Sequence, residues 1–358
     1  MKEYQVIGNA ASGSIRFNTD SSKLEIYNGE AWWEIDSTSP ELQTGGTRGL
    51  IFGGYSTPNN GSNMIGHINI ASTGNEVDSG GDLLNARYGM GSVADRTRGL
   101  AFGGRNDPSP AASVNVIQFV TISIGNNAID FGDLLSGQGW SQNAGCSNRT
   151  RGIIGGGYQN PQSPANKNII SFVTIQSLGN AIDFGDLTSA RGALAAASSP
   201  TRGLFIGGRT GPGNDDKVVT IDFVTTSTTG NAADFGDLTV ATSHFTGFSN
   251  AIRAVSGQGY QGPGYTSRVN TMEFITMATL GNALDFGDAT RANSTPGSAS
   301  SPTRGVMIGG GKSPSPYGTT VMDYVEIMSE GNAIDFGDLV DDQSEGMTAT
   351  SNGHGGLG

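Results

Sequence analysis

The chain has 358 residues, including 57 glycines and 13 prolines, and its formal net charge at pH 7 is −12. The glycines do not recur at every third position, which excludes a collagen helix, and a charged fraction of 15% is too small for a disordered polyelectrolyte. No basic stripe is present to neutralise phosphates, so we expect no nucleic-acid partner.

The first residues give no sign of a targeting segment. Residues 1–13 lack a basic region followed by an apolar run, and no apolar run in the chain approaches the length of a membrane span. We therefore expect synthesis in a cytoplasm without a classical secretion signal, and no membrane insertion. The single cysteine, Cys146, excludes a framework of internal disulfides.

Residues 1–36 are predicted to form a small three-stranded β meander, and residues 37–46 a linker. The strands cover 14–18, 23–27 and 31–35, and Asn28-Gly29 is typical of a hairpin turn. Alternation places six apolar side chains on one face: Ile15, Phe17, Leu24, Ile26, Trp33 and Ile35. A meander of this size is marginal alone, so we expect it to dock on the rest of the chain or to assemble with copies of itself, for example as a homotrimer.

Six repeats of about 50 residues follow. Each repeat begins with an arginine before an apolar run and a pair of small residues, and it closes on an aspartate that ends the motif Asn-Ala-x-Asp-Phe-Gly-Asp or a variant of it. The arginines are Arg48, Arg98, Arg151, Arg202, Arg253 and Arg304, at intervals of 50, 53, 51, 51 and 51 residues. The aspartates are Asp82, Asp133, Asp186, Asp237, Asp288 and Asp338, at intervals of 51, 53, 51, 51 and 50 residues.

Each repeat contains four short predicted strands, which indicates an all-β fold. The strand after the arginine ends at the glycine pair, the next is apolar on both faces, the third holds a phenylalanine such as Phe235, and the fourth is rich in small residues. Stacked four-stranded sheets of this kind predict a six-bladed β-propeller over residues 47–358. The glycine pair, the aromatic residue in the third strand and an arginine before the fourth, as at Arg191, resemble kelch repeats. A strand near 345–351 is expected to complete the first blade.

The charged residues that resemble site residues, the repeated arginines and aspartates, occur in every repeat. This favours a structural role for them. Asp-Phe-Gly-Asp resembles metal-binding loops, but two aspartates supply too few oxygens for calcium, so we expect a turn whose phenylalanine fills the space between blades and no bound metal. The repeated arginines and aspartates are equal in number, which suggests a ring of bidentate ion pairs, across or within blades. A ring of arginines that binds substrate is the alternative.

No catalytic constellation is evident, and we expect neither enzymatic activity nor a cofactor. The three histidines occupy different repeat positions, and Cys146 has no evident base.

The repeats differ most in the loops 55–63, 105–115, 158–168, 209–217, 260–268 and 312–319 and in the segment 134–148. Such divergent loops are candidate ligand sites, through Tyr and Trp stacking and Asn hydrogen bonds. The candidate residues are Tyr55, Asn59, Trp140, Tyr158, Tyr260, Tyr265 and Tyr317. Ordinary solvated loops are the alternative interpretation.

Two segments resemble proteins of bacteriophages. Residues 13–20, 23–29 and 31–35, with the pattern Gly-x-Ile-Arg-x-Asn-Thr-Asp followed by Tyr-Asn-Gly and Trp, resemble a short module of tail-fibre and other virion structural proteins. The repeats are similar to those of propeller proteins in phages of marine bacteria, especially cyanophages. The resemblance implies a virion component whose N-terminal module contacts other virion proteins and whose propeller binds a host-surface glycan or protein. The alternatives are a decoration or tail-assembly protein that contacts only virion proteins, and a glycan-degrading propeller enzyme.

Overall fold

The computed structural model describes residues 10–18, 23–35, 46–56, 60–106, 114–135, 144–158, 166–211, 216–265, 267–312, 318–340 and 345–358. These residues form β-strands and one short 3-10 helix, Gly355–Leu357, so the expectation of an all-β fold is confirmed. No helix among them has the length and apolarity that a membrane crossing requires. The chain divides into two compact units, Met1–Gln43 and Thr44–Gly358, and the division falls inside the predicted linker.

The first unit contains the predicted meander. Strands β1 (Ile15–Asn18), β2 (Lys23–Tyr27) and β3 (Trp32–Ile35) pair antiparallel in the order β1-β2-β3. Asn28 forms the predicted turn, because its side-chain oxygen accepts hydrogen bonds from the amides of Glu30 and Ala31 at 2.8 Å each. The register opposes Ile15 to Ile26 and Ile26 to Trp33, which places these apolar side chains on one face.

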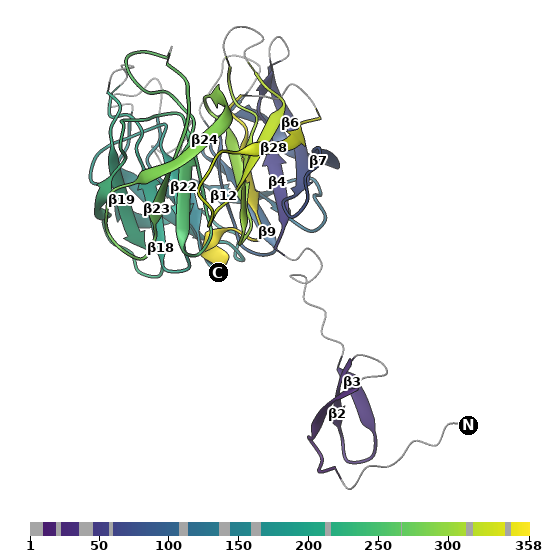
Figure 1. Cartoon of the computed structure of the whole chain (residues 1–358). Helices are drawn as coiled ribbons and strands as arrows, with labels where there is room; N and C mark the ends of the chain where they lie inside the picture. Colours follow the sequence, from purple (N-terminus) through teal and green to yellow (C-terminus); the bar gives the residue numbers. More distant parts are fainter. Residues whose placement is uncertain are drawn as a thin grey trace. The chain divides into compact units, whose positions relative to one another are not determined.

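The described residues of the second unit form six successive sheets, here numbered one to six, which stand side by side (Figure 1). Sheet one comprises β4 (Arg48–Phe52), β5 (Tyr55–Ser56), β6 (Asn60–Asn69), β7 (Val77–Tyr88), β10 (Arg105–Asn106) and β29 (Thr348–Ser351). Sheet two comprises β8 (Gly91–Ala94), β9 (Arg98–Phe102), β11 (Val116–Thr121) and β12 (Ile129–Asp133), and sheet three comprises β13 (Ala144–Ser147), β14 (Arg151–Gly155), β15 (Ile169–Thr174) and β16 (Ile182–Asp186). Sheet four comprises β17 (Ala195–Ser198), β18 (Arg202–Ile206), β19 (Thr220–Thr225) and β20 (Ala233–Asp237). Sheet five comprises β21 (Thr246–Ser249), β22 (Arg253–Gly257), β23 (Val269–Thr276) and β24 (Leu284–Asn293), and sheet six comprises β25 (Gly297–Ser300), β26 (Arg304–Ile308), β27 (Val321–Glu326) and β28 (Ile334–Asp338). Several four-stranded antiparallel sheets in this order are consistent with a β-propeller.

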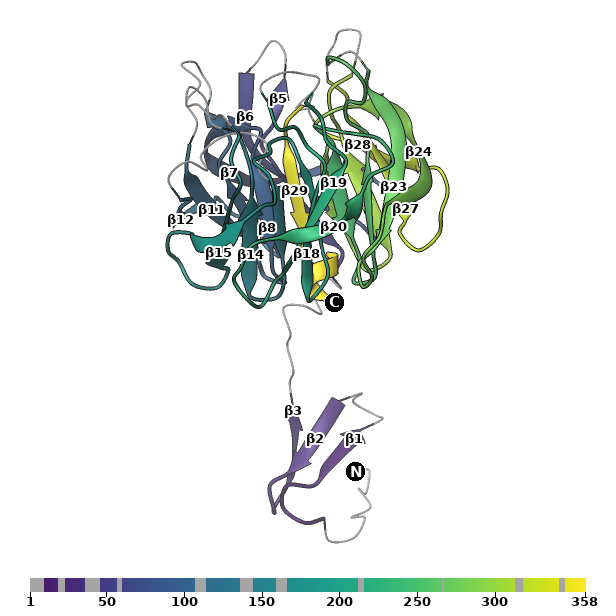
Figure 2. The same cartoon turned by 90° about the vertical axis from the view of Figure 1, so that its left-hand side faces the viewer.

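The end of the chain supplies a strand to the first sheet, as the sequence predicts. Strand β29, yellow in Figure 2, lies near the C-terminus. It pairs antiparallel with β4, which begins at Arg48. Asn352 then accepts a hydrogen bond from the amide of Arg48 at 3.0 Å. Within sheet five the same bond joins Asn250 to the amide of Arg253 at 2.8 Å, between strands that are consecutive in the chain. The C-terminal strand therefore occupies the place that the fourth predicted strand has in the other repeats.

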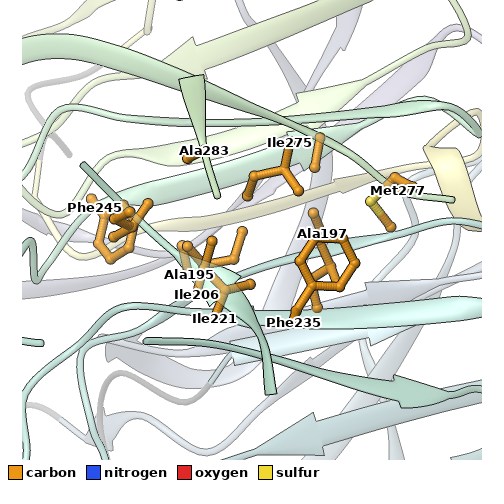
Figure 3. Close-up of a cluster of buried hydrophobic side chains, with 12 residues drawn as sticks. Ala195, Ala197, Ile206, Ile221, Phe235, Phe245, Ile275, Met277 and Ala283 are labelled. Atoms are coloured by element: carbon orange, nitrogen blue, oxygen red, sulfur yellow. The ribbon is translucent and has the colours of Figure 1, made fainter. Parts of the chain in front are cut away.

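Apolar clusters fill the spaces between sheets. In the described part of the chain, six clusters of buried side chains are present, and each combines residues of two sheets. The cluster in Figure 3 joins Ile206 and Phe235 of sheet four to Phe245 and Ile275 of sheet five. Burial of one such phenylalanine contributes about 2 kcal/mol. The expectation that the phenylalanine of Asp-Phe-Gly-Asp fills the space between sheets is confirmed.

Hydrogen bonds of an asparagine that precedes the Asp-Phe-Gly-Asp strand join the same pairs of sheets. In each case the side-chain oxygen of an asparagine accepts a hydrogen bond, at 2.9 to 3.1 Å, from the amide of the closing aspartate in another sheet. The pairs are Asn127 with Asp82, Asn180 with Asp133, Asn231 with Asp186, Asn282 with Asp237, Asn332 with Asp288, and Asn75 with Asp338. The last pair joins sheet one to sheet six.

Candidate functional site

The predicted ion pairs between repeated arginines and closing aspartates are absent from the described residues. Arg202 opposes Thr225 at one end of β19, whereas Asp237 opposes Thr220 at the other end. Five residues of extended strand separate these two positions, which corresponds to about 16 Å. The hypothesis of Arg–Asp pairing is therefore wrong. Within a sheet the strand between the two residues holds them apart, and among the described residues no repeated arginine forms an ion pair with a closing aspartate of another sheet.

The arginines instead join neighbouring sheets by another route. Five of them donate a hydrogen bond from Nη1, at 3.0 to 3.4 Å, to a backbone carbonyl of another sheet. The pairs are Arg98 with Ile175, Arg151 with Thr226, Arg202 with Met277, Arg253 with Ile327, and Arg304 with Ala71. Each of these guanidinium groups also lies 4.1 to 5.1 Å from the centroid of an aromatic ring in its own sheet. In sheet one, Arg48 has its Nε buried without a hydrogen-bond partner.

Arg202→Ala is expected to lower the free energy of unfolding by about 2 kcal/mol, because it removes a charged hydrogen bond to Met277 and the cation–π contact with Phe223. Asp237→Ala is expected to change it by less than about 0.5 kcal/mol, because the Asp237 side chain is exposed and its junction bond is made by the backbone. Urea unfolding of both variants and of the double variant tests this. Equal single effects that do not add would restore the ion-pair hypothesis.

A cavity of about 170 Å³ is lined by strands of all six sheets. The lining strands are β8, β13, β17, β21, β25 and β29. Serine hydroxyls next to it bond the backbone of the neighbouring sheet, as Ser249 does to the carbonyl of Ser198 at 2.7 Å. His354 lines the cavity, and its Nε2 lies 2.9 Å from the carbonyl of Ala94. Arg96 and Arg149 donate to the carbonyl of Leu357, which fixes the C-terminal segment beside these strands.

His244, which also lines the cavity, connects it to a group of aromatic and cationic side chains. We call this group the tyrosine–arginine cluster; it consists of Tyr158, Arg209, Lys217, His244, Tyr260 and Tyr265. The centroids of the His244 and Tyr260 rings are 5.6 Å apart, those of His244 and Tyr265 5.3 Å, and those of Tyr260 and Tyr265 5.1 Å. All three contacts are edge-to-face, the arrangement that aromatic quadrupoles favour.

Arg209, which follows β18 of sheet four, links tyrosines from the loops of sheets three and five. Its guanidinium lies 5.3 Å from the ring centroid of Tyr158 and 5.9 Å from that of Tyr265, and Nη1 donates to the Tyr265 hydroxyl. Lys217 donates from Nζ to the carbonyls of Gly262 and Gly264, at 2.8 and 3.1 Å, and so fixes the segment that presents Tyr265. The side chain of Arg209 is buried, with 7% of its surface exposed.

Burial and positive charge act together on the titrating groups of the cluster. Burial, together with the charges of Arg209 and Lys217, lowers the pKa of His244 to about 3. Burial raises the pKa of Tyr265, an effect that the nearby charge of Arg209 opposes. His244 is therefore a neutral aromatic ring at pH 7, while Arg209 and Lys217 supply the positive charge.

Acid is expected to destabilise the protein through His244. The unfolded chain binds a proton at this residue below about pH 6.5, whereas the folded chain does not until about pH 3, so the stability falls by up to about 1.4 kcal/mol per pH unit between these values. In His244→Asn, which suits the left-handed backbone at φ 57°, this slope should be smaller. Thermal unfolding of both proteins between pH 7.5 and pH 4.5 checks the prediction. Parallel curves with the same pH dependence would contradict it.

The structure thus brings together three of the predicted loop residues, Tyr158, Tyr260 and Tyr265. Tyr55 lies elsewhere and packs on Tyr88, with ring centroids 5.1 Å apart. Asn59, Trp140 and Tyr317 lie outside the described residues. The sequence analysis missed Arg209 and His244 as members of a site. A signal for Arg209 exists, because it directly follows the glycine pair at the position that Tyr55, Tyr158 and Tyr260 have in other repeats.

The described part of the chain offers few candidates for a metal site or a catalytic nucleophile. Within it, no three His, Cys, Asp or Glu residues are grouped so that they could hold a metal ion. Cys146 is buried, and burial raises the pKa of its thiol to about 12, so it is a poor nucleophile at neutral pH. A comparison with known protein families gives no match, and no curated protein matches the sequence.

Proposed function

We propose that this chain is a structural component of a bacteriophage particle, a tail fibre or another head or tail appendage, that displays a six-bladed propeller to bind the host surface. Residues 47–358 would form the closed ring, and the N-terminal module would attach the chain to other virion proteins or to copies of itself. The ligand would be a surface glycan or protein. Weak binding at one site would be strengthened by many copies on one particle.

Contacts between the last sheet and the first support a closed ring. Asn75 accepts a hydrogen bond from the amide of Asp338 at 3.1 Å, and Arg304 donates to the carbonyl of Ala71 at 3.0 Å. One apolar cluster combines Ile51 and Ile68 of sheet one with residues of sheet six. These contacts repeat the ones that join sheets adjacent in the sequence. A ring of six blades explains them without further assumptions.

One observation carries the binding role. The residues that all repeats share are occupied in joining the sheets, whereas the side chains of the tyrosine–arginine cluster differ between repeats and gather where the loops of three sheets meet. Function in such scaffolds is usually located in loops that a rigid framework positions. Tyrosine supplies a large contact area that loses little conformational entropy on binding.

Adsorption tests the proposal. An antibody to the chain should label phage particles. Labelled purified protein should bind to marine bacterial cells of a strain that these phages infect. Added in excess, the protein should reduce infection of those cells. If the antibody labels the particles but the purified protein does not bind to cells, the decoration or tail-assembly role is favoured. Release of oligosaccharides from host polysaccharide would favour the glycan-degrading enzyme. Absence of the chain from particles would contradict the proposal.

The N-terminal module supports the assembly role. Phe17 and Trp33 are 61% and 62% exposed, and Ile15, Leu24 and Ile26 accompany them on the same face. The opposite face satisfies its own polar groups, because Arg16 binds Glu25 at 2.7 Å and lies 4.2 Å from the Trp32 ring centroid. An apolar face this extensive on so small a sheet is typical of an interface, here with copies of the same module.

Phe17→Ser is therefore expected to convert an oligomer, a trimer if the homotrimer hypothesis holds, into monomers. The reason is the loss of apolar area that the shared face would bury. Sedimentation velocity measures the change. Leu178→Ser is the matched control, because Leu178 is equally exposed, at 60%, but belongs to the second unit. A wild-type protein that is monomeric at micromolar concentration would contradict this prediction.

A further inference from the structure

We infer that the tyrosine–arginine cluster binds an acidic sugar, with Arg209 contacting its carboxylate or sulfate group. The inference rests on the proposed binding role and specifies its ligand. Two observations on the described residues point to a ligand. Arg209 is a buried cation with no acidic partner among them, and two buried polar atoms, Arg209 Nε and Asn166 Oδ1, have no hydrogen-bond partner there.

Arg209 has no carboxylate partner among the described residues. Its side chain contacts the Tyr158 and Tyr265 rings and the Tyr265 hydroxyl, and no ion pair joins it to a described Asp or Glu. Asp216, the acidic residue beside Lys217 in sequence, has an exposed side chain whose Oδ2 faces Gly211. Burying a guanidinium without a counter-ion is unfavourable, so an unbalanced buried cation favours a site completed by an anion. The chain has more acidic than basic residues, with a net charge of −12, yet none of the described acidic residues pairs with Arg209.

Arg191, whose side chain bonds residues of sheet four, provides a contrast. Arg191 is fully buried, and its Nη2 binds Asp222 Oδ2 at 2.6 Å, while Nη1 donates to the carbonyls of Gly207 and Thr220. The carboxylate of Asp222 balances the charge of Arg191 inside the sheet. Arg209 has tyrosine rings where Arg191 has a carboxylate. The charge of Arg191 is balanced within the protein, whereas that of Arg209 is left for a ligand.

The unpartnered atoms match the chemistry of a sugar acid. Arg209 Nε is a donor without a partner, which suits a carboxylate or sulfate oxygen. Asn166 Oδ1 is a buried acceptor without a partner, which suits a sugar hydroxyl. Asn166 is fixed by its Nδ2, which donates to the backbone carbonyl of Arg209 at 3.1 Å, so the Asn166 side chain lies beside the Arg209 backbone. Gly192 has no side chain to cover Asn166 Oδ1, which would lie 3.0 Å from a Cβ at that position.

The aromatic rings complete the site. Tyr265 is 36% exposed and can stack on the apolar face of a pyranose ring. The contacts of Tyr265 with His244 and Tyr260 hold its ring in place before a ligand arrives. Because His244 is neutral, the ring contributes shape without a further charge. The site therefore combines one buried cation, one acceptor and one exposed ring.

Calorimetric titration with three sugars tests the inference on the full chain. Trigalacturonate supplies carboxylates, a sulfated galactotriose supplies sulfates, and neutral galactotriose is the reference. At least one acidic sugar should bind at least about tenfold more tightly than the neutral one, and added salt should weaken that binding. The stronger of the two acidic sugars identifies the anion. Equal affinity for all three, or binding of none, would overturn the inference.

Arg209→Gln should reduce binding of the preferred acidic sugar about tenfold or more, whereas Lys312→Gln, which removes one charge from another loop, should leave it within about twofold. Tyr265→Ala provides a second variant with an exposed side chain, should Arg209→Gln unfold; its affinity for all three sugars should fall. Retention of full affinity by these variants overturns the inference. Cell adsorption measured in parallel separates the two proposals: adsorption that Arg209→Gln leaves unchanged refutes this site alone, and failure of wild-type adsorption refutes the proposed function.

Discussion

Gly132→Ala is expected to lower the free energy of unfolding by about 4 kcal/mol. Gly132 has φ +147°, where a side chain costs roughly 1–3 kcal/mol, and a Cβ there would lie 2.5 Å from the carbonyl oxygen of Gly179 in the neighbouring sheet. Such overlap with backbone adds about 1–3 kcal/mol, because neither sheet can yield without breaking the bond between Asn180 and the amide of Asp133. Urea unfolding of the variant measures the loss.

Gly331→Ala isolates the contribution of the contact. Gly331 has φ +148°, nearly the same as Gly132, but its Cβ would meet no atom within 4 Å. The control should therefore lose only the backbone strain, about 2 kcal/mol. The difference between the two variants measures how closely sheets two and three approach. Equal losses would show that the glycine serves backbone conformation alone and that the sheets tolerate a methyl group between them.

The repeat period predicted the strands well because its apolar runs and glycine pairs are local signals. The strand after each arginine, the phenylalanine strand and the closing strand near 345–351 all appear close to their predicted positions. The N-terminal strands and the turn at Asn28 were also predicted, since alternation and an Asn-Gly pair act over a few residues. These features do not depend on how one sheet meets the next.

Contacts between sheets were predicted less well. Equal copy number suggested that Arg202 pairs with Asp237, but a shared period only shows that both residues serve the same repeated unit. The partners are a carbonyl and an aromatic ring for Arg202 and an asparagine side chain for the Asp237 amide, and backbone partners leave no residue signature. Arg209 and His244 were missed for a related reason: their neighbours come from other sheets, at sequence distances that no local pattern reveals.

Deletion of residues 345–358 is expected to abolish folding of the second unit and to produce aggregates. The deletion removes β29 and the buried side chains of Met347 and Leu357, whose burial contributes about 4–5 kcal/mol before any hydrogen bond is counted. Domains of this kind are stable by only about 5–15 kcal/mol. It also leaves β4, with Leu50, Ile51 and Phe52, as an unpaired apolar edge strand, which is a template for aggregation.

The measurement is the soluble fraction after expression, followed by circular dichroism and thermal unfolding of whatever remains soluble. Deletion of residues 1–43 is the control, since these residues form a separate unit and their loss should leave the melting temperature of the second unit unchanged. A synthetic peptide with the sequence of residues 345–358, added during refolding, should rescue the truncated protein, because the pairing of β29 with β4 involves no chain connection nearby. A truncated chain that remains soluble and melts cooperatively at the wild-type temperature would show that the closing strand is dispensable.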